Sequence, residues 1–269
     1  MRGKDDHSSH GSESEHTLIS PLFGELSLDF LVRSAPHPCP YLPTREAQED
    51  VFRTSELHPE LYHDFMDYGF RRSGDYFYRP VCPNCRECHP IRVPTQDFVL
   101  TKSQRRVRNK NRDISITVGR PVLTEEKYSM YTDYLARQHR PSTHTSRTEL
   151  AATLYASPVH TLEFEYRLNG RLVAASIADV SSRSLSSVYV YYDLNLSSRS
   201  LGTYTALREI LFCRNRGIPY YYLGFLVPNC PSMSYKARFR PYETLGCDLS
   251  WNRESTQQEE RDDREQARS

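Results

Sequence analysis

The chain has 269 residues, enough for one large domain or two modest ones with a buried core. Lys and Arg total 35 and Asp and Glu total 34, so the net charge of +1 by itself indicates nothing about nucleic acid, and only the distribution of charge along the chain can. The sequence has no run of 18 apolar residues, and its polar start has no apolar segment typical of a secretory signal, so we expect a cytoplasmic protein without a membrane partner.

Both ends of the chain are polar. Residues 1–18 are rich in Ser, His and acids, and residues 252–269 are charged throughout, so we expect two disordered tails. Between them, we expect a Cys-bearing N-terminal domain over residues 19–118 and a second domain over residues 119–251. A reduced cytoplasm disfavours disulfides, so the seven cysteines point instead to metal binding or chemistry.

One helix is predicted in the N-terminal domain. The stretch "HPELYHDFMDYGF" places Leu61, Phe65, Met66 and Tyr68 at roughly helical spacing. Gly69 follows directly and is suited to end the helix.

Three cysteines are spaced two residues apart in "RPVCPNCRECHPIRV". These are Cys82, Cys85 and Cys88, and Cys39 in "PCPYLP" is available as a fourth ligand. Four thiolates suit tetrahedral zinc or a [4Fe–4S] cluster, whose bacterial ligand run has the same double spacing. Incidental thiols are one alternative, and a c-type haem attachment by Cys-x-x-Cys-His is another, although that attachment is typical of exported proteins.

The next segment, "TKSQRRVRNKNRD", has no acid between positions 102 and 112. Its basic residues are Lys102, Arg105, Arg106, Arg108, Lys110 and Arg112. A segment this basic can neutralise several phosphates of a nucleic acid. A solvated basic surface is the alternative.

The second domain begins with three β-rich runs. The first two, in "TLEFEYRLNGRLVAASIADV", are joined by Asn169-Gly170, a strong hairpin signal, and "SSVYVYYDL" is the third. "LGTYTALREILFCRNRG" is a predicted helix that ends at Gly217, and "IPYYYLGF" is a further strand. The order β-β-β-α-β, with a crossover helix between two parallel strands, is that of the N-acetyltransferase-like (GNAT) fold, a mixed α/β (α+β) architecture.

Two basic positions flank these last elements. At the start of the predicted helix, "SSRSLGTY" combines free backbone N–H groups with Arg199, which favours an anion; a cap by Ser198 or Ser200 is the alternative. After the last strand, "MSYKARFRPYE" carries Lys236 and Arg238, which suit a carboxylate or a phosphate.

Blocks spread from about residue 20 to Trp251 resemble the aminoacyl-tRNA–protein transferases of the arginyltransferase superfamily, most of all its bacterial aspartate/glutamate leucyltransferase branch. The blocks are "CPYLPTREAQ", "GFRRSGDYFYRPVCPNCRECHPIRV", "SQRRVRNKN", "RSLGTYTALREI", "YYYLGF" and "MSYKARFRPYE". The resemblance implies an enzyme that transfers leucine, or alternatively arginine, from aminoacyl-tRNA to the N-terminal amine of proteins that begin with Asp or Glu. This transfer marks the acceptor for N-degron degradation and consumes no nucleotide or coenzyme A.

The resembling blocks mark the positions of candidate site residues, and the roles of Asp193, the tyrosines, Lys236 and Arg238 within them rest on physical argument. Asp193 is the candidate base or amine anchor, and Tyr191 and Tyr192 are expected to line the cleft. The residues expected to bind tRNA phosphates are Lys102, Arg105 and Arg106. Arg199 is expected at the acceptor end of the tRNA, and Lys236 and Arg238 are expected at the acidic side chain of the acceptor protein. The four cysteines are expected to hold [4Fe–4S] in preference to zinc.

Two blocks, "RQHRPSTHTSRTEL" and "YYDLNL", depart from the bacterial pattern, which leaves the transferred amino acid and the strictness of acceptor choice open. An acyl-coenzyme A-dependent N-acyltransferase is the second interpretation. It is disfavoured because "RSLGTY" lacks a second, closely spaced glycine for a pyrophosphate. An RNA-binding protein with structural zinc is the third.

Overall fold

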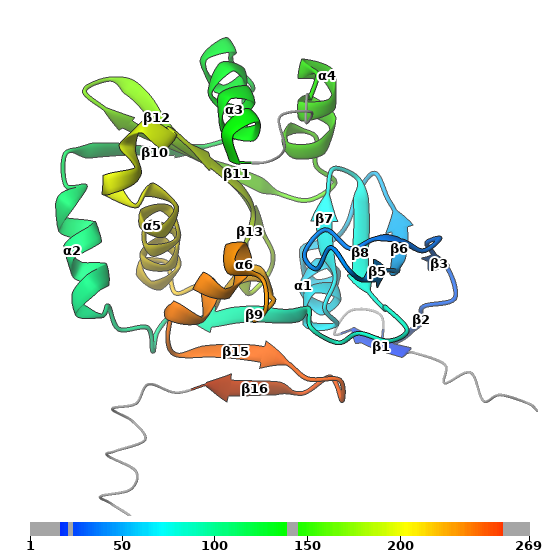
Figure 1. Ribbon diagram of the computed structural model, residues 1–269. Coiled ribbons are helices and arrows are strands. Elements are labelled where there is room, and N and C mark those ends of the chain that lie inside the picture. Colours follow the sequence, from blue (N-terminus) through cyan, green and yellow to red (C-terminus); the bar gives the residue numbers. More distant parts are fainter. Residues whose placement is uncertain (1–16, 21–23, 139–144, 255–269) are drawn as a thin grey trace, which may run out of the picture.

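The computed structural model describes residues 17–20, 24–138 and 145–254 (Figure 1). Within these ranges, no helix is long and apolar enough to span a membrane. Strand β1 (Thr17–Ser20) pairs with β2 (Gly24–Ser27), and β16 (Trp251–Glu254) ends the described chain. Both predicted tails were therefore too long: two residues of the first and three of the second pair as strands, and the remainder lies outside the described residues.

A large mixed sheet of eight strands forms the centre of the molecule. Its order is β10 (Ile114–Gly119), β11 (Thr161–Leu168), β12 (Arg171–Val180), β13 (Ser184–Tyr192), β14 (Tyr220–Leu226), β9 (His89–Pro94), β15 (Tyr242–Leu245) and β16. Neighbouring strands are antiparallel except β13 and β14, which are parallel.

The predicted GNAT-like core is confirmed. Asn169 and Gly170 both have positive φ, at 50° and 82°, and form the tight turn between β11 and β12. Helix α5 (Leu201–Asn215) crosses from β13 to β14, and Gly217, at φ 68°, follows its end.

Helices cover both faces of the large sheet. On one face, α5 packs with Ala174 and Ala178 of β12, and α2 (Lys102–Lys110) lies beside α5. On the other face, Ala175 and Ile177 pack against α3 (Glu125–Gln138), α4 (Arg147–Leu150) and the π-helical turn η1 (Ala151–Tyr155). Neighbouring residues of a strand point to opposite faces, which accounts for the two separate cores.

A smaller sheet packs beside the large one (Figure 1). Its order is β3 (Val32–Arg33), β6 (Glu49–Arg53), β8 (Tyr76–Pro80) and β7 (Arg71–Ser73). The predicted helix, α1 (Pro59–Asp67), supplies Phe65 to its aromatic core, and Gly69 follows the helix at φ 86°. The remaining elements are β4 (His37–Pro38), β5 (Glu46–Ala47), η2 (Leu194–Arg199), α6 (Pro231–Ser234) and η3 (Tyr235–Arg238).

A buried ion pair joins the two sheets. Arg72 of β7 donates to the Asp179 carboxylate of β12 at 2.6 and 2.7 Å, and neither side chain is exposed. Tyr62 and Thr161 also donate to Asp179, at 3.0 and 2.7 Å. The expected domain boundary between residues 118 and 119 falls inside β10, and β9, which precedes it, is an interior strand of the large sheet.

Candidate active site and candidate metal centre

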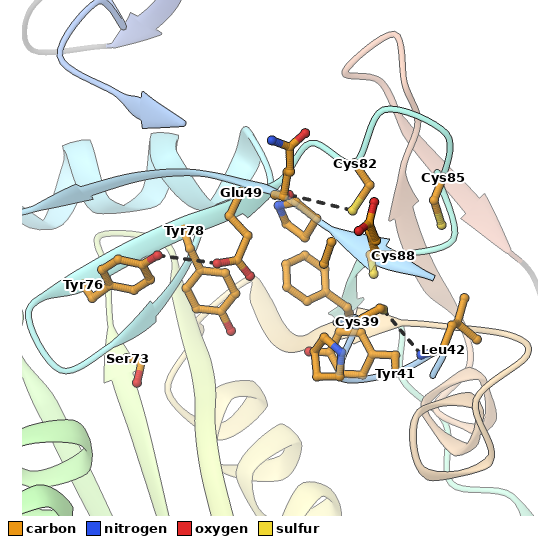
Figure 2. Close-up of a pocket in the computed structure, with 16 residues that line it drawn as sticks. Cys39, Tyr41, Leu42, Glu49, Ser73, Tyr76, Tyr78, Cys82, Cys85 and Cys88 are labelled. Carbon is orange, nitrogen blue, oxygen red and sulfur yellow. Dashed lines mark hydrogen bonds between the residues drawn. The ribbon is translucent and has the colours of Figure 1, made fainter. Parts of the chain in front are cut away.

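Four cysteines from two loops line one cavity of about 290 Å³ (Figure 2). Cys82, Cys85 and Cys88 lie on the loop between β8 and β9, and Cys39 follows β4. The backbone N–H of Leu42 donates to the Cys39 sulfur at 3.4 Å. The cavity therefore brings together the three thiols that the spacing singled out and Cys39, the predicted fourth ligand.

The cysteine cavity is a difficult place for free thiolates. Burial raises the pKa of Cys88 to about 12, and Cys39, Cys82 and Cys85 add to the rise because their charges would oppose that of the Cys88 thiolate. A cation among the sulfurs would reverse this balance, since metal coordination deprotonates a thiol.

Four cysteines supply the donor set that both structural zinc and a [4Fe–4S] cluster use. Among the described residues, no three His, Cys, Asp or Glu side chains are placed to hold a single metal ion. Zinc needs its four sulfurs about 2.3 Å from one point, whereas a [4Fe–4S] cluster spreads its four cysteine ligands around several iron atoms.

A second notable site lies where β13 and β14 separate. Residues Ser184 to Ser186 of β13 pair with the start of β14, and no further pairs follow between the two strands. Just beyond this point, between Tyr222 and Gly224, the pairing of β14 with β9 shifts register. Gly224 has φ 91°, so its backbone conformation favours glycine. A side chain there would start 3.4 Å from the Lys236 Nζ and 3.7 Å from an Arg71 nitrogen, so the missing side chain leaves room beside both cations.

Arg71 and Lys236 are both buried, each with 7% of its surface exposed. Arg71 donates to the Ser186 hydroxyl at 2.8 Å and to the Ser187 carbonyl, and Lys236 donates to the Phe225 carbonyl at 2.8 Å. Neither forms a salt bridge with a described carboxylate. Burial, followed by the charge of Arg71, lowers the pKa of Lys236 to about 7.

Of the two basic residues predicted near this strand end, only Lys236 faces the interior. Arg238 is exposed, and its carbonyl accepts a hydrogen bond from Gln104 of α2. The sequence pattern predicts no role for Arg71, which lies in the block "GFRRSG". The sequence signal that could have indicated a role is the pair of adjacent arginines in one short strand. Successive side chains of a strand point to opposite faces, so Arg71 points to the gap between β13 and β14 and Arg72 points to Asp179.

Asp193 lies at the end of β13 and lines a cavity of about 250 Å³ together with Tyr192 and Tyr134. Burial alone would raise the pKa of Asp193. Hydrogen bonds from the Asn195 backbone and from Arg171, at 2.9 and 2.8 Å, outweigh burial and hold the pKa below its usual range. A carboxylate whose pKa is held this low is a weak base, and Asp193 already has Arg171 as its ion-pair partner.

The two tyrosines before Asp193 point to opposite faces of β13. Tyr192 lines the cavity and packs against Gly202 of α5. Tyr191 is fully buried, and its hydroxyl lies 2.7 Å from that of Tyr155. The structure therefore does not bring Tyr191 to the cavity, because strand alternation turns it into the core under α3.

Most of the basic segment forms α2, whose first turn is closed by a capping box of Thr101 and Gln104. Its exposed basic residues are Lys102, Arg105, Arg106 and Lys110, and Arg112 is exposed just after the helix. Arg199 donates to both oxygens of Asp113 at 2.8 Å, so this predicted anion ligand is already paired. Ser200, the N-cap of α5, makes no side-chain hydrogen bond to the helix.

Comparison with known proteins gives matches over both halves of the chain. The family model "Arginine-tRNA-protein transferase, N terminus" matches residues 37–106, and "Arginine-tRNA-protein transferase, C terminus" matches residues 126–246. These spans contain the cysteine loop and the two cations at the strand gap.

Curated relatives agree with the family models. "Aspartate/glutamate leucyltransferase" of Pseudomonas aeruginosa (strain UCBPP-PA14) is 37% identical over 211 residues, which cover 77% of this chain and 90% of the relative. The protein of the same name from Pseudomonas entomophila (strain L48) is 36% identical over 215 residues, covering 78% and 91%. Among solved structures, L-PGS from Bacillus licheniformis is similar with a TM-score of 0.39 and 13% identity, over 65% of this chain and 52% of that one.

Proposed function

The chain belongs to the arginine-tRNA-protein transferase family, and from this premise we propose that it transfers an amino acid from aminoacyl-tRNA to the N-terminal amine of proteins that begin with Asp or Glu. Leucine is the proposed donor residue because the curated relatives are named leucyltransferases, and arginine is the alternative. The proposed setting is the cytoplasm, where the added residue marks the acceptor for N-degron degradation.

The observation that carries this proposal is the pair of buried cations at the strand gap. Burying an unpaired charge is costly, and here burial and Arg71 lower the pKa of Lys236 to about 7, so Lys236 is only partly charged at neutral pH. An anionic ligand would compensate Arg71 and favour the charged form of Lys236, so the site suits such a ligand. The side chain of an N-terminal Asp or Glu supplies one carboxylate of the right size. It can lie beside Gly224 and accept hydrogen bonds from Lys236 and Arg71.

The reaction needs alignment more than new chemistry. The acceptor amine attacks the ester carbonyl of aminoacyl-tRNA, the tetrahedral oxyanion collapses, and the ribose hydroxyl of the tRNA leaves with a proton. In this proposal, Asp193 holds the ammonium of one reactant. Burial and the neighbouring Tyr192 raise the pKa of Tyr235 to about 12, so its hydroxyl stays protonated and can donate a hydrogen bond.

A transfer assay tests the proposal directly. The purified protein is offered radiolabelled Leu-tRNA or Arg-tRNA with peptides that differ only in their first residue, which is Asp, Glu, Asn or Lys. We expect label on the Asp and Glu peptides alone, from Leu-tRNA. Transfer from Arg-tRNA to the same peptides would show that arginine, and not leucine, is the transferred amino acid. No transfer from either tRNA, together with acylation from acetyl-coenzyme A, would contradict the proposal.

We also propose that Cys39, Cys82, Cys85 and Cys88 hold a [4Fe–4S] cluster. The support is the convergence of four thiols on one cavity and the cost of their thiolates without a cation. Acyl transfer requires no electrons, so the cluster would supply structure or redox sensitivity. It would stabilise the loop before β9 and, through Cys88, the packing against Phe225 and Met233.

Replacing Cys85 with Ser is expected to remove the cluster. Protein purified without oxygen should contain stoichiometric iron and sulfide, and Cys85→Ser should lose both, because one thiolate ligand is replaced by a hydroxyl. Cys247→Ser is the matched control, since Cys247 is exposed and does not line the cavity. Equal metal content in both variants would contradict the shared site, and zinc in place of iron would contradict the cluster.

A further inference from the structure

A groove with three arginines runs between α2, β10 and α5. Its volume is about 510 Å³. Arg108 projects from α2, Arg112 from the turn after it, and Arg208 from the middle of α5. The other residues that line it are Asn109, Ile114, Ile116, Tyr204 and Leu211.

The groove is positive and has no internal compensation. None of its lining residues is Asp or Glu, and none of its arginines forms a salt bridge with a described residue. Asp113, next to Arg112 in the chain, is held by Arg199 through two bonds of 2.8 Å. The Nε of Arg208 is buried without a hydrogen-bond partner within the described ranges.

We propose that this groove binds a backbone phosphate of tRNA, with Arg208 as a ligand beside Arg108 and Arg112. The inference rests on the proposed function, which gives the protein an RNA substrate. An arginine fork donates two parallel N–H groups to a phosphate, and three such forks with no acid favour that anion. The apolar floor of Ile114 and Ile116 suits the ribose that adjoins the phosphate.

The position of Arg208 agrees with the approach of the tRNA end. Arg208 lies seven residues after Leu201, the first residue of α5. At 1.5 Å per residue this is roughly 10 Å along the helix axis. The first turn of α5 follows the end of β13 in the chain, so the groove begins within this distance of the sheet end where Asp193 lies.

The test measures binding of uncharged tRNA by the full chain over a series of salt concentrations. Arg208→Gln is expected to weaken binding roughly tenfold or more, because it removes a charged hydrogen-bonding group. It should also reduce the slope of log affinity against log salt by about 0.7 to 0.9, the value for one phosphate contact. Arg208→Lys should keep most of the slope, because it keeps the charge.

Arg53→Gln is the matched control. It removes the same charge from an exposed position on β6, where Arg53 lies 3.5 Å from Asp75, and should change neither affinity nor slope. Thermal unfolding of each variant establishes that it is folded. A wild-type salt slope in folded Arg208→Gln would overturn the groove proposal while leaving the transferase function intact. A wild-type protein that binds no tRNA at low salt would instead contradict the function.

A second arm separates RNA phosphate from a small anion. Inorganic phosphate alone is titrated into the wild type and into Arg208→Gln by calorimetry. Weak or absent binding of inorganic phosphate, with a reduced tRNA slope in the variant, would support the RNA assignment. Binding of inorganic phosphate that Arg208→Gln abolishes, with an unchanged tRNA slope, would identify a small-anion site and overturn it.

Discussion

Lys236→Met is expected to lower kcat/KM for peptides that begin with Asp or Glu by roughly 30-fold to several thousand-fold, while leaving the affinity for tRNA unchanged. Removing one partner of a buried, hydrogen-bonded charge pair costs about 2 to 5 kcal/mol, and each 1.36 kcal/mol is a factor of ten. Lys236 is the natural partner for the acceptor carboxylate because it is buried, lies beside Gly224 and has no described carboxylate to neutralise it. Single-turnover transfer with saturating aminoacyl-tRNA provides the measurement.

The same experiment with an Asn peptide separates recognition from folding. If Lys236 binds the carboxylate, the wild type should strongly prefer Asp over Asn, and Lys236→Met should lose most of that preference. Arg71→Met should behave in the same way. Arg238→Gln serves as the comparison, because it removes an equal charge from an exposed position two residues further on. Losses of equal size on the Asp and Asn peptides would show that Lys236 acts on structure alone.

The pH dependence offers a second readout of the same prediction. Burial and Arg71 lower the pKa of Lys236 to about 7, so the free enzyme loses the Lys236 charge as pH rises through that value. Acceptor kcat/KM should therefore fall on the alkaline side, whereas deprotonation of the attacking amine, with a usual pKa of about 7.7 to 8.0, acts in the opposite direction. Lys236→Arg stays charged, so the alkaline fall should disappear. An identical profile in both enzymes would exclude Lys236 as its source.

The local parts of the fold could be predicted from the sequence, and the long-range pairings could not. The hairpin at Asn169-Gly170 and the end of α5 at Gly217 are set by backbone conformations that glycine adopts easily, so short sequence stretches are enough. Strand β9 is different, because "HPIRVP" lies between the cysteine loop and the basic helix and pairs with β14, more than a hundred residues later. That pairing depends on tertiary packing.

The candidate site divides in the same way. Cysteine spacing predicted a shared location for three thiols, Cys39 was named as the available fourth, and the structure places all four on one cavity. Charge density alone could not reveal that Arg199 is paired with Asp113, since the partners are 86 positions apart. Arg71 could not be identified from the sequence for a related reason. Its proposed role as an anion ligand depends on the gap between β13 and β14, which exists only in the assembled sheet.

Loss of the Arg72–Asp179 ion pair between the two sheets is expected to have the largest effect on stability. Arg72→Met should lower the free energy of unfolding by about 3 to 5 kcal/mol, because it leaves the Asp179 carboxylate buried without its counter-charge. Tyr62 and Thr161 would still donate to that carboxylate, but hydrogen bonds from two hydroxyl groups do not replace a guanidinium. Urea unfolding gives the change directly, and for a chain of this size the melting temperature should fall by roughly 6 to 20 °C.

Arg253→Met is the matched control for this measurement. Arg253 and Asp97 also form an ion pair, at 2.8 Å, but their side chains are 45% and 47% exposed, so its loss should cost about 0 to 1 kcal/mol. Arg72→Met combined with Asp179→Leu should recover much of the lost stability, since an apolar pair leaves no buried charge. If the single and double variants were equally unstable, the cost would come from packing around Arg72. If Arg72→Met unfolded like the control, the pair would not be what holds the small sheet against the transferase core, and the position of Arg71 at the strand gap would depend on other contacts.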